Sequence, residues 1–351
     1  MQLLSASLWD TRRAKSLFPL TLLTLTVLGL LLVYRSVFRG SEAPLVVYCA
    51  HDSIYSEKIL NQFEKATGIR VAPRFDTEAT KSLGLVELLI REKDQPRCDV
   101  FWNNELLGTL DLHERDILHA YKGPGYSRIP DAYKDADGYW TGFGARLRVL
   151  IVNTDLASDV ESHVRERLRG NLSRVAIAKP LYGTTLTHYS VLWQALGREN
   201  VQAWHADSRK RGLREVNGNA TVKNLVAKGV CDFGFTDTDD YFVAKDEGYP
   251  VSMLPVRLDD GHTIAIPNTV AIINGTKRLS EAKQLVDFLL SETCEIALAN
   301  SRSRQVPLGD VNEESLSAEV RQLRPLIESG YPLTSLSPAR AACLQWLKTL
   351  P

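Results

Sequence analysis

The sequence predicts an α/β protein with two domains. Strands and helices alternate along most of the chain, and this alternation builds parallel sheets with right-handed crossovers. The 351 residues are too many for one small core and suit two domains. Apolar residues make up 44% of the chain and charged residues 24%, as in ordinary globular proteins. Because 42 basic residues balance 42 acidic ones, the net charge does not point to nucleic acid as a partner.

The amino terminus carries an uncharged run rich in Leu and Thr, residues 17–34, which Arg12, Arg13 and Lys15 precede. Eighteen residues is the lower limit for a membrane-spanning helix and long for a signal-peptide core. No clear cleavage site follows, and the basic flank favours a cytoplasmic tail. We expect residues 1–44 to anchor an outward-facing, periplasmic protein at the cytoplasmic membrane. A cleaved signal peptide, releasing a soluble protein, is the alternative.

Three strands open the folded part of the chain. Residues 45–48 are the first, and an amphipathic helix over 56–67 follows, stopped by Gly68. The next predicted elements are a strand over 69–75, a helix over 82–93 and a strand over 98–102. Polar clusters follow these strands at one edge of the predicted sheet, namely His51 and Asp52; Asp76, Thr77 and Glu78; and Asn103, Asn104 and Glu105. Open α/β sheets bind ligands at such an edge.

A second unit starts near Arg146, with predicted strands over 147–153 and 175–178. A helix over 188–196 follows the turn formed by Gly183, Thr184 and Thr185. The exposed N–H groups of such a helix start can bind an anion. A plain helix cap by one of the threonines is an equally good interpretation. Asn219 lies in the turn that opens the next helix. Residues 264–273 return as a strand, and the remainder is largely helical.

An acidic turn follows the apolar strand predicted over residues 229–235. Asp237, Asp239 and Asp240 crowd this turn before a helix over 241–247. Helix capping needs one such residue and tolerates a second. Three carboxylates within four positions repel one another unless a cation or a set of donors compensates. The turn therefore predicts part of a ligand site, with helix capping as the alternative.

Several ordered segments carry a resemblance to a known family. They read VVYCAHD over 46–52, FEKATGI over 63–69, CDVFWNNE over 98–105 and GFGARLRV over 142–149, with a further match over 261–273. From about residue 45 to about residue 308, the chain resembles the extracellular solute-binding subunits of ABC importers, in the ferric-iron-binding branch.

The resemblance implies a type II periplasmic-binding-protein fold, in which two α/β lobes joined by hinge strands close over a ligand. We expect lobe I over 45–145 and 262–305, and lobe II over 146–261 and 306–351. The implied partners are an ABC permease and its ATPase, and we expect a monomer without a catalytic cofactor.

The resemblance also implies Fe(III) as the ligand, captured in the cleft between the lobes. The implied metal ligands are His51, Glu105, Asp237, Asp239 and Asp240. Asp239 and Asp240 stand where the family has two adjacent tyrosines. The residues implied to hold the ligand or a synergistic phosphate or carbonate are Asp52, Thr80, Arg146, Gly183, Thr184, Thr185 and Asn219.

The missing tyrosine pair leaves other ligands open. Carboxylates suit Fe(III), but in tyrosine-containing sites the phenolates provide much of the affinity for Fe(III). The acidic turn equally suits an ammonium group, as in a polyamine, between aromatic walls formed by Trp102, Tyr139 and Trp140. Arg146 and Lys81, beside the Gly-Thr-Thr turn, suit a phosphorylated sugar or a phosphonate.

An enzyme is the alternative from a different class, because paired carboxylates can do acid–base chemistry. The sequence has no nucleophile elbow, phosphate-loop lysine motif or His-x-x-x-His pair. We therefore expect binding without turnover.

The five cysteines cannot all pair with one another. Cys49, Cys98 and Cys231 fall at predicted strands, where a small buried side chain fits. Cys294 and Cys343 lie on carboxy-terminal helices and could form a disulfide in an exported protein.

Overall fold

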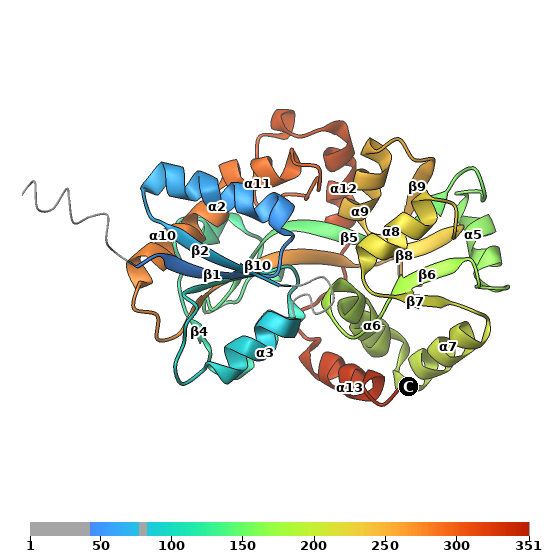
Figure 1. Ribbon diagram of the computed structural model, residues 1–351, viewed down its shortest axis with the longest axis horizontal. Helices are drawn as coiled ribbons and strands as arrows, with labels where there is room; N and C mark the ends of the chain where they lie inside the picture. The colour runs from blue at the N-terminus through green and yellow to red at the C-terminus, as the bar shows by residue number, and fades with distance from the viewer. Residues whose placement is uncertain (1–42, 77–82, 351) are drawn as a thin grey trace, which may run out of the picture. The chain divides into compact units, whose positions relative to one another are not determined.

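The computed structural model describes residues 43–76 and 83–350 and divides the chain into two units, Met1–Pro44 and Leu45–Pro351. The second unit is shown in Figure 1 and described below. The predicted membrane anchor over residues 17–34 lies outside the described residues. Within the two described ranges, no helix is both long enough and apolar enough to cross a membrane.

The strands of the second unit form one mixed sheet with the order β2-β1-β3-β10-β5-β8-β6-β7, while β4 pairs with β10 and β9 with β5. Pairing is parallel among β1, β2 and β3 and among β6, β7 and β8, and antiparallel where β5 and β10 are involved. The strands are β1 (Leu45–Cys49), β2 (Val71–Phe75), β3 (Val100–Asn103), β4 (Leu118–His119), β5 (Thr141–Asn153), β6 (Val175–Ala178), β7 (Arg214–Val216), β8 (Phe233–Asp237), β9 (Val251–Pro255) and β10 (Ala265–Ile273).

Helices lie between many of the successive strands, and others follow the last strand. They are α2 (Ser53–Thr67), α3 (Leu83–Arg91), α4 (Leu107–Glu114), α5 (Glu161–Arg167), α6 (Gly183–Leu196), α7 (Arg198–Lys210), α8 (Asn219–Ala227), α9 (Thr238–Asp246), α10 (Leu279–Leu289), α11 (Glu292–Ala299), α12 (Ala318–Glu328) and α13 (Ser337–Leu347). Short 3₁₀ turns lie at Tyr126–Arg128, Asp131–Tyr133 and Glu313–Ser315.

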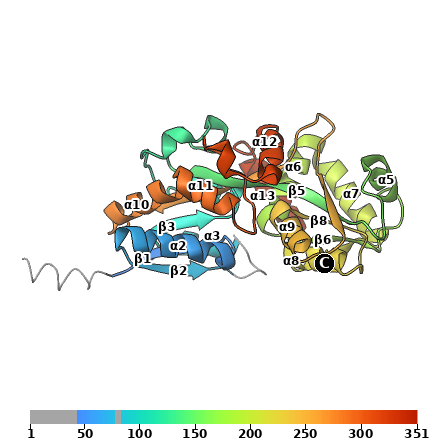
Figure 2. The ribbon, with the colours of Figure 1, turned by 90° about the horizontal axis from the view of Figure 1, so that it is seen from above.

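Strand β5 joins two parts of the sheet (Figures 1 and 2). Residues 141–147 of β5 pair with β10, next to β1 and β3, whereas residues 148–153 pair with β8 and β9. All thirteen residues of β5 are buried. This arrangement confirms the predicted α/β class, with one group of parallel strands on each side of β5 and β10. The lobe boundaries stay a prediction.

Three apolar clusters hold these elements together. The largest lies around β1, β3, β5 and β10 under α2, α10, α11 and α12. A second lies beneath α3 and α4, and a third joins β6 and β8 to α6 and α13. Cys294 belongs to the first cluster and Cys343 to the third, and both are free buried thiols. The disulfide considered between them is therefore wrong, since each thiol packs in a different core.

Two elements that frame the acidic turn begin elsewhere than predicted. Gly229 has a φ of 70° just after α8, and β8 begins at Phe233. The stretch 229–232 is therefore a turn, and the strand runs on through Asp237. Helix α6 begins at Gly183, so the Gly-Thr-Thr turn is itself the first turn of the helix.

Candidate functional site

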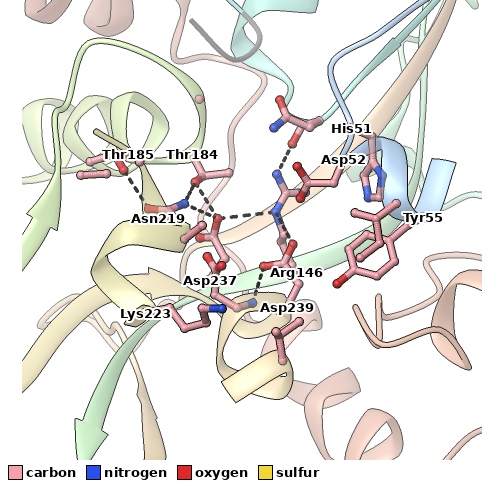
Figure 3. Close-up of a pocket in the computed structure, with 18 of the residues that line it drawn as sticks. His51, Asp52, Tyr55, Arg146, Thr184, Thr185, Asn219, Lys223, Asp237 and Asp239 are labelled. Carbon is pink, nitrogen blue, oxygen red and sulfur yellow. Dashed lines mark hydrogen bonds and ion pairs between the residues drawn. The ribbon is translucent and has the colours of Figure 1, made fainter. Parts of the chain in front are cut away.

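A cavity of about 320 Å³ lies where the carboxyl ends of β1, β3, β6, β7 and β8 meet the starts of α2, α6, α8 and α9. This is the edge at which the sequence predicts a site, and Figure 3 shows the cavity. Its lining comprises His51, Asp52, Ile54, Tyr55, Asn104, Arg146, Ala178, Tyr182, Gly183, Thr184, Thr185, Gly218, Asn219, Ala220, Lys223, Asp237, Asp239, Asp240, Val243, Glu247 and Arg302.

A buried ion pair lies behind the acidic turn. Arg148 on β5 stands opposite Asp237 on β8 in the strand register, and its Nη1 donates to Asp237 Oδ1 at 2.7 Å. The other oxygen, Asp237 Oδ2, accepts from Thr184 Oγ1 at 2.6 Å and from Asn219 Nδ2 at 2.9 Å. The Arg148 and Asp237 side chains are 0% and 4% exposed. Both oxygens of this carboxylate are therefore hydrogen-bonded by the protein itself.

Arg146, also on β5, extends into the middle of the cavity (Figure 3). Its Nε lies 3.6 Å from Asp237 Oδ2 and 3.8 Å from Asp239 Oδ2. Its Nη2 donates to the main-chain oxygen of Asn104. Its buried Nη1 makes no hydrogen bond in the part of the chain that the structure describes. One N–H edge of this buried guanidinium is thus without a partner among the described residues.

The two arginines determine the charge state of Asp237. Burial alone would raise the pKa of this carboxyl group, but Arg148, Arg146 and the Thr184 hydroxyl outweigh burial and hold the pKa below its ordinary value. Its side chain makes no hydrogen bond to the start of α9. Asp237 is therefore an ionised partner of arginines rather than a helix cap.

Asp239 and Asp240 lie in the first turn of α9 and both line the cavity. Asp240 Oδ2 accepts from Thr236 Oγ1 at 2.6 Å. Asp239 Oδ1 accepts from the main-chain N–H of Asp240 at 3.0 Å. The compensation that the sequence requires for three crowded carboxylates thus comes partly from arginines and hydroxyl groups of this chain.

His51 lies on the side of the cavity formed by the start of α2 (Figure 3). Its ring stacks on Trp102 with centroids 5.3 Å apart, and the Gln305 amide nitrogen lies 2.9 Å from His51 Nε2. Trp102, Tyr139 and Trp140 do not line the cavity, and both tryptophans are core residues. The predicted aromatic walls are absent from the cavity lining, whereas Tyr55 is part of it.

Glu105, a predicted metal ligand, is not part of the cavity lining. Its carboxylate accepts from the main-chain N–H groups of Leu107 and Gly108, at 2.5 Å and 2.8 Å. It caps the start of α4 because a buried carboxylate there satisfies helix N–H groups that have no partner in the helix. Two other predicted residues, Thr80 and Lys81, lie outside the described residues.

The remaining predicted residues do meet around one cavity: His51, Asp52, Arg146, Gly183, Thr184, Thr185, Asn219, Asp237, Asp239 and Asp240. Their roles stay predictions. Over residues 43–76 and 83–350, no group of three or more His, Cys, Asp or Glu side chains is placed to hold a metal ion.

Sequence reasoning missed Arg148, which lies behind the cavity, and some of the residues that line it. Arg148 follows Arg146 by two positions in a strand, and such residues share one face, so the spacing could have identified it as part of the site. Lys223 follows Asn219 by four positions in α8, which again places both on one face. Tyr55, Tyr182 and Arg302 carried no comparable signal, whereas Asn104 belongs to a polar cluster expected at this edge and does line the cavity.

The starts of α6 and α8 differ from that of α9. Neither first turn contains an acidic residue, and neither start has a side-chain cap. The first turn of α9 contains Asp239 and Asp240. Since the N-terminus of a helix carries a partial positive charge, the α6 and α8 starts favour an anion in the cavity, beside the Asp237 carboxylate that accepts from the Thr184 and Asn219 side chains.

Solved structures of other proteins share this fold. The chain is similar to iron-bound HitA from Pseudomonas aeruginosa, with a TM-score of 0.74 and 20% identity over 87% of this chain and 99% of that one. For a ferric binding protein from Campylobacter jejuni, the TM-score is 0.74 and the identity 17%, over 87% of this chain and 98% of that one. For AfuA from Actinobacillus pleuropneumoniae, with exogenous fructose-6-phosphate bound, the TM-score is 0.69 and the identity 18%, over 88% of this chain and 98% of that one.

These likenesses confirm the predicted periplasmic-binding-protein fold. A family model described as bacterial extracellular solute-binding protein matches residues 45–301, well over half of the chain. The chain therefore belongs to the bacterial extracellular solute-binding proteins, the ligand-capturing components of ABC importers.

Proposed function

We propose that this protein captures a small organic solute carrying a phosphoryl or phosphonate group and presents it to an ABC permease. The observation that carries the proposal is Arg146. Its side chain is 3% exposed, it lines the cavity, and its Nη1 has no hydrogen-bond partner among the described residues. Guanidinium groups bind phosphoryl oxygens through strong, charge-assisted hydrogen bonds.

The starts of α6 and α8 support an anionic ligand beside Arg146. Gly183, Thr184 and Thr185 from α6 line the cavity, as do Gly218 and Asn219 from α8. Two helix starts without acidic residues offer main-chain N–H groups and positive dipole ends to the same anion. The cavity volume of about 320 Å³ falls at the lower end of the range for small-molecule pockets. The likeness to AfuA, solved with fructose-6-phosphate, agrees with this proposal.

Ferric iron, with phosphate or carbonate as a synergistic anion, is the second candidate. The likeness to iron-bound HitA and the carboxylates of Asp239 and Asp240 at the cavity favour it. We rank it second because Asp237 is already bonded by Arg148 and Glu105 caps α4. Fe(III) prefers several anionic oxygen ligands, and these two carboxylates are engaged elsewhere.

The test uses the full chain purified without chelator. Elemental analysis and native mass spectrometry identify any co-purified ligand, and calorimetric titration then compares glucose 6-phosphate, an alkylphosphonate, glucose and ferric citrate. We expect glucose 6-phosphate or an alkylphosphonate to bind and glucose not to bind. Near-stoichiometric iron without an organic adduct would favour the second candidate. Binding of neither phosphorylated compounds nor iron contradicts both.

An Arg146→Gln variant tests the residue that carries the proposal. We expect affinity for the phosphorylated solute to fall at least tenfold, since a charge-assisted hydrogen bond contributes about 1.5–3 kcal/mol. Calorimetry measures the change, and circular dichroism checks that the variant is folded. Arg165→Gln on the exposed face of α5 removes the same charge far from the cavity lining and should leave the affinity unchanged.

The finer features of the exported protein follow from its family and from its amino terminus. We propose that residues 17–34 anchor it at the membrane, that it acts with a permease and an ATPase, and that it binds without turnover. We also propose lobe I over 45–145 and 262–305, and lobe II over 146–261 and 306–351. A mature protein that begins near Ser41 in the soluble fraction would contradict the anchor while keeping export.

A further inference from the structure

We propose that Lys223 is a specificity-determining residue that makes the cavity selective for a doubly charged phosphoryl group over a singly charged carboxylate. This inference rests on the proposed function, because it concerns the anionic end of the same ligand. It adds a residue that the sequence did not identify and a charge requirement that the solute must meet.

The position of Lys223 is the first reason. It lies one helical turn beyond Asn219 on α8 and lines the same cavity. Side chains on a helix lean toward its N-terminus, so the ammonium group is directed back toward the α8 start. Figure 3 shows the side chain extending from α8 on the side of Asp237 and Asp239. Its charge therefore adds to the positive end of the α8 dipole.

The lack of a partner is the second reason. Lys223 is only 9% exposed, and its ammonium group makes no hydrogen bond or ion pair over residues 43–76 and 83–350. Other lysines of the chain pair with acids, as Lys245 does with Glu319 at 2.7 Å. The stem of the side chain is buried, whereas its Nζ is not fully enclosed by the chain, so the ammonium group reaches the cavity. An anion from outside the chain would supply the missing partner.

Three neighbouring acids interact with groups other than Lys223, and one of them, Asp239, lies 3.8 Å from Arg146 Nε. Asp237 is bonded by Arg148, Thr184 and Asn219. Asp240 accepts from the Thr236 hydroxyl at 2.6 Å. Lys223 and the Nη1 edge of Arg146 are then two positive groups facing one cavity. Two such groups match a phosphate monoester, which carries close to two negative charges at neutral pH, better than a carboxylate with one.

The experiment measures selectivity in the full chain. Calorimetric titration at pH 7.5 compares glucose 6-phosphate with glucuronate, which carries a carboxylate at the same sugar position. We expect the wild type to prefer glucose 6-phosphate by at least a hundredfold. Lys223→Gln should lower this preference at least tenfold, mainly by weakening glucose 6-phosphate. Lys223→Arg should restore most of it, because the charge returns.

Lys228→Gln is the matched control, since Lys228 is exposed at the end of the same helix and does not line the cavity. It should leave both affinities unchanged. An unchanged preference in folded Lys223→Gln overturns the role of Lys223 but leaves the proposed function standing. If that variant does not fold, a wild type that binds the two sugars equally well overturns the inference by itself. A wild type that binds neither phosphoryl nor phosphonate compounds overturns the proposed function instead.

Discussion

The cavity has two unlike sides. On one side, the start of α9 contributes Asp237, Asp239 and Asp240, the densest cluster of carboxylates that the sequence shows. On the other side, the starts of α6 and α8 contribute small and hydroxyl-bearing residues, with no acidic residue in either first turn. The first side is conspicuous in the sequence and the second is not.

The structure reverses the expected importance of the two sides. Asp237 is held by Arg148 from the neighbouring strand, and Arg146 lies within 4 Å of both Asp237 and Asp239. Much of the charge on the acidic side is therefore satisfied within the chain. The main-chain donors of α6 and α8, by contrast, have no side-chain cap and no acidic residue in their own first turns, and Asp237 accepts only from the Thr184 and Asn219 side chains there. A conspicuous cluster of charged residues can thus stabilise the structure around a site, while the residues that bind the ligand lie beside the cluster.

The largest expected effect comes from removing Arg148, which holds the Asp237 carboxylate on the acidic side of the cavity. Arg148→Met should lower the free energy of unfolding by about 3–5 kcal/mol, because breaking a buried ion pair leaves Asp237 uncompensated. Urea unfolding followed by circular dichroism measures this change. A loss below about 1 kcal/mol would mean that Arg146 alone can hold the carboxylate.

Two further variants test whether the loss of stability comes from the buried pair of Arg148 and Asp237. Arg165→Met breaks an exposed pair with Glu161, in which both side chains are 57% exposed, and should change the stability by no more than about 0.5 kcal/mol. The double variant Arg148→Met with Asp237→Leu removes both buried charges and should recover much of the stability lost in the single variant.

Acid should act selectively on the same side of the cavity. The folded-state pKa of Asp237 is below its ordinary value, so its contribution is fully present above the unfolded pKa of about 3.9 and is lost as pH falls through the folded pKa. Wild type should therefore lose stability at low pH faster than Asp237→Asn, by no more than about 1.4 kcal/mol per pH unit. Urea unfolding between pH 6 and pH 3 measures both slopes, and parallel slopes would contradict the pKa direction.

Much of the fold could be predicted from the sequence because its elements have local signals. Apolar runs and glycine stops predicted β1, α2 and β10 to within a few residues. The sheet order could not be read in the same way, since β5 pairs with β8, β9 and β10 across long separations in the chain. The shift of β8 arose because Val230 and Cys231 are apolar like a strand but lie in the turn after α8.

The site was predicted less completely than the fold, because its contacts, like the strand pairings, join segments that are far apart in the sequence. His51 and Asp52 were placed at the site because topology brings strand ends together, whereas Asn219 was named from the family resemblance. Glu105 satisfied the same rule, yet its side chain turns to the N–H groups of α4. Which of two available partners a carboxylate takes depends on packing, and the sequence alone does not reveal it. Arg148 was missed because its role depends on the strand pairing with Asp237.

The smallest expected effect distinguishes the two sides most sharply. Asp239→Asn together with Asp240→Asn keeps side-chain size while removing two charges from the rim of the cavity. If the anionic side holds a phosphorylated solute, affinity for glucose 6-phosphate should stay unchanged or rise by less than about tenfold, because only like-charge repulsion is removed. Affinity for ferric citrate, if there is any, should fall steeply with the loss of anionic oxygens. Calorimetry on the folded double variant measures both, with Asp246→Asn, at the far end of the same helix, as the control. A tenfold or greater loss of glucose 6-phosphate affinity would show that the acidic turn itself contacts the ligand, and the comparison between the two sides would then be wrong.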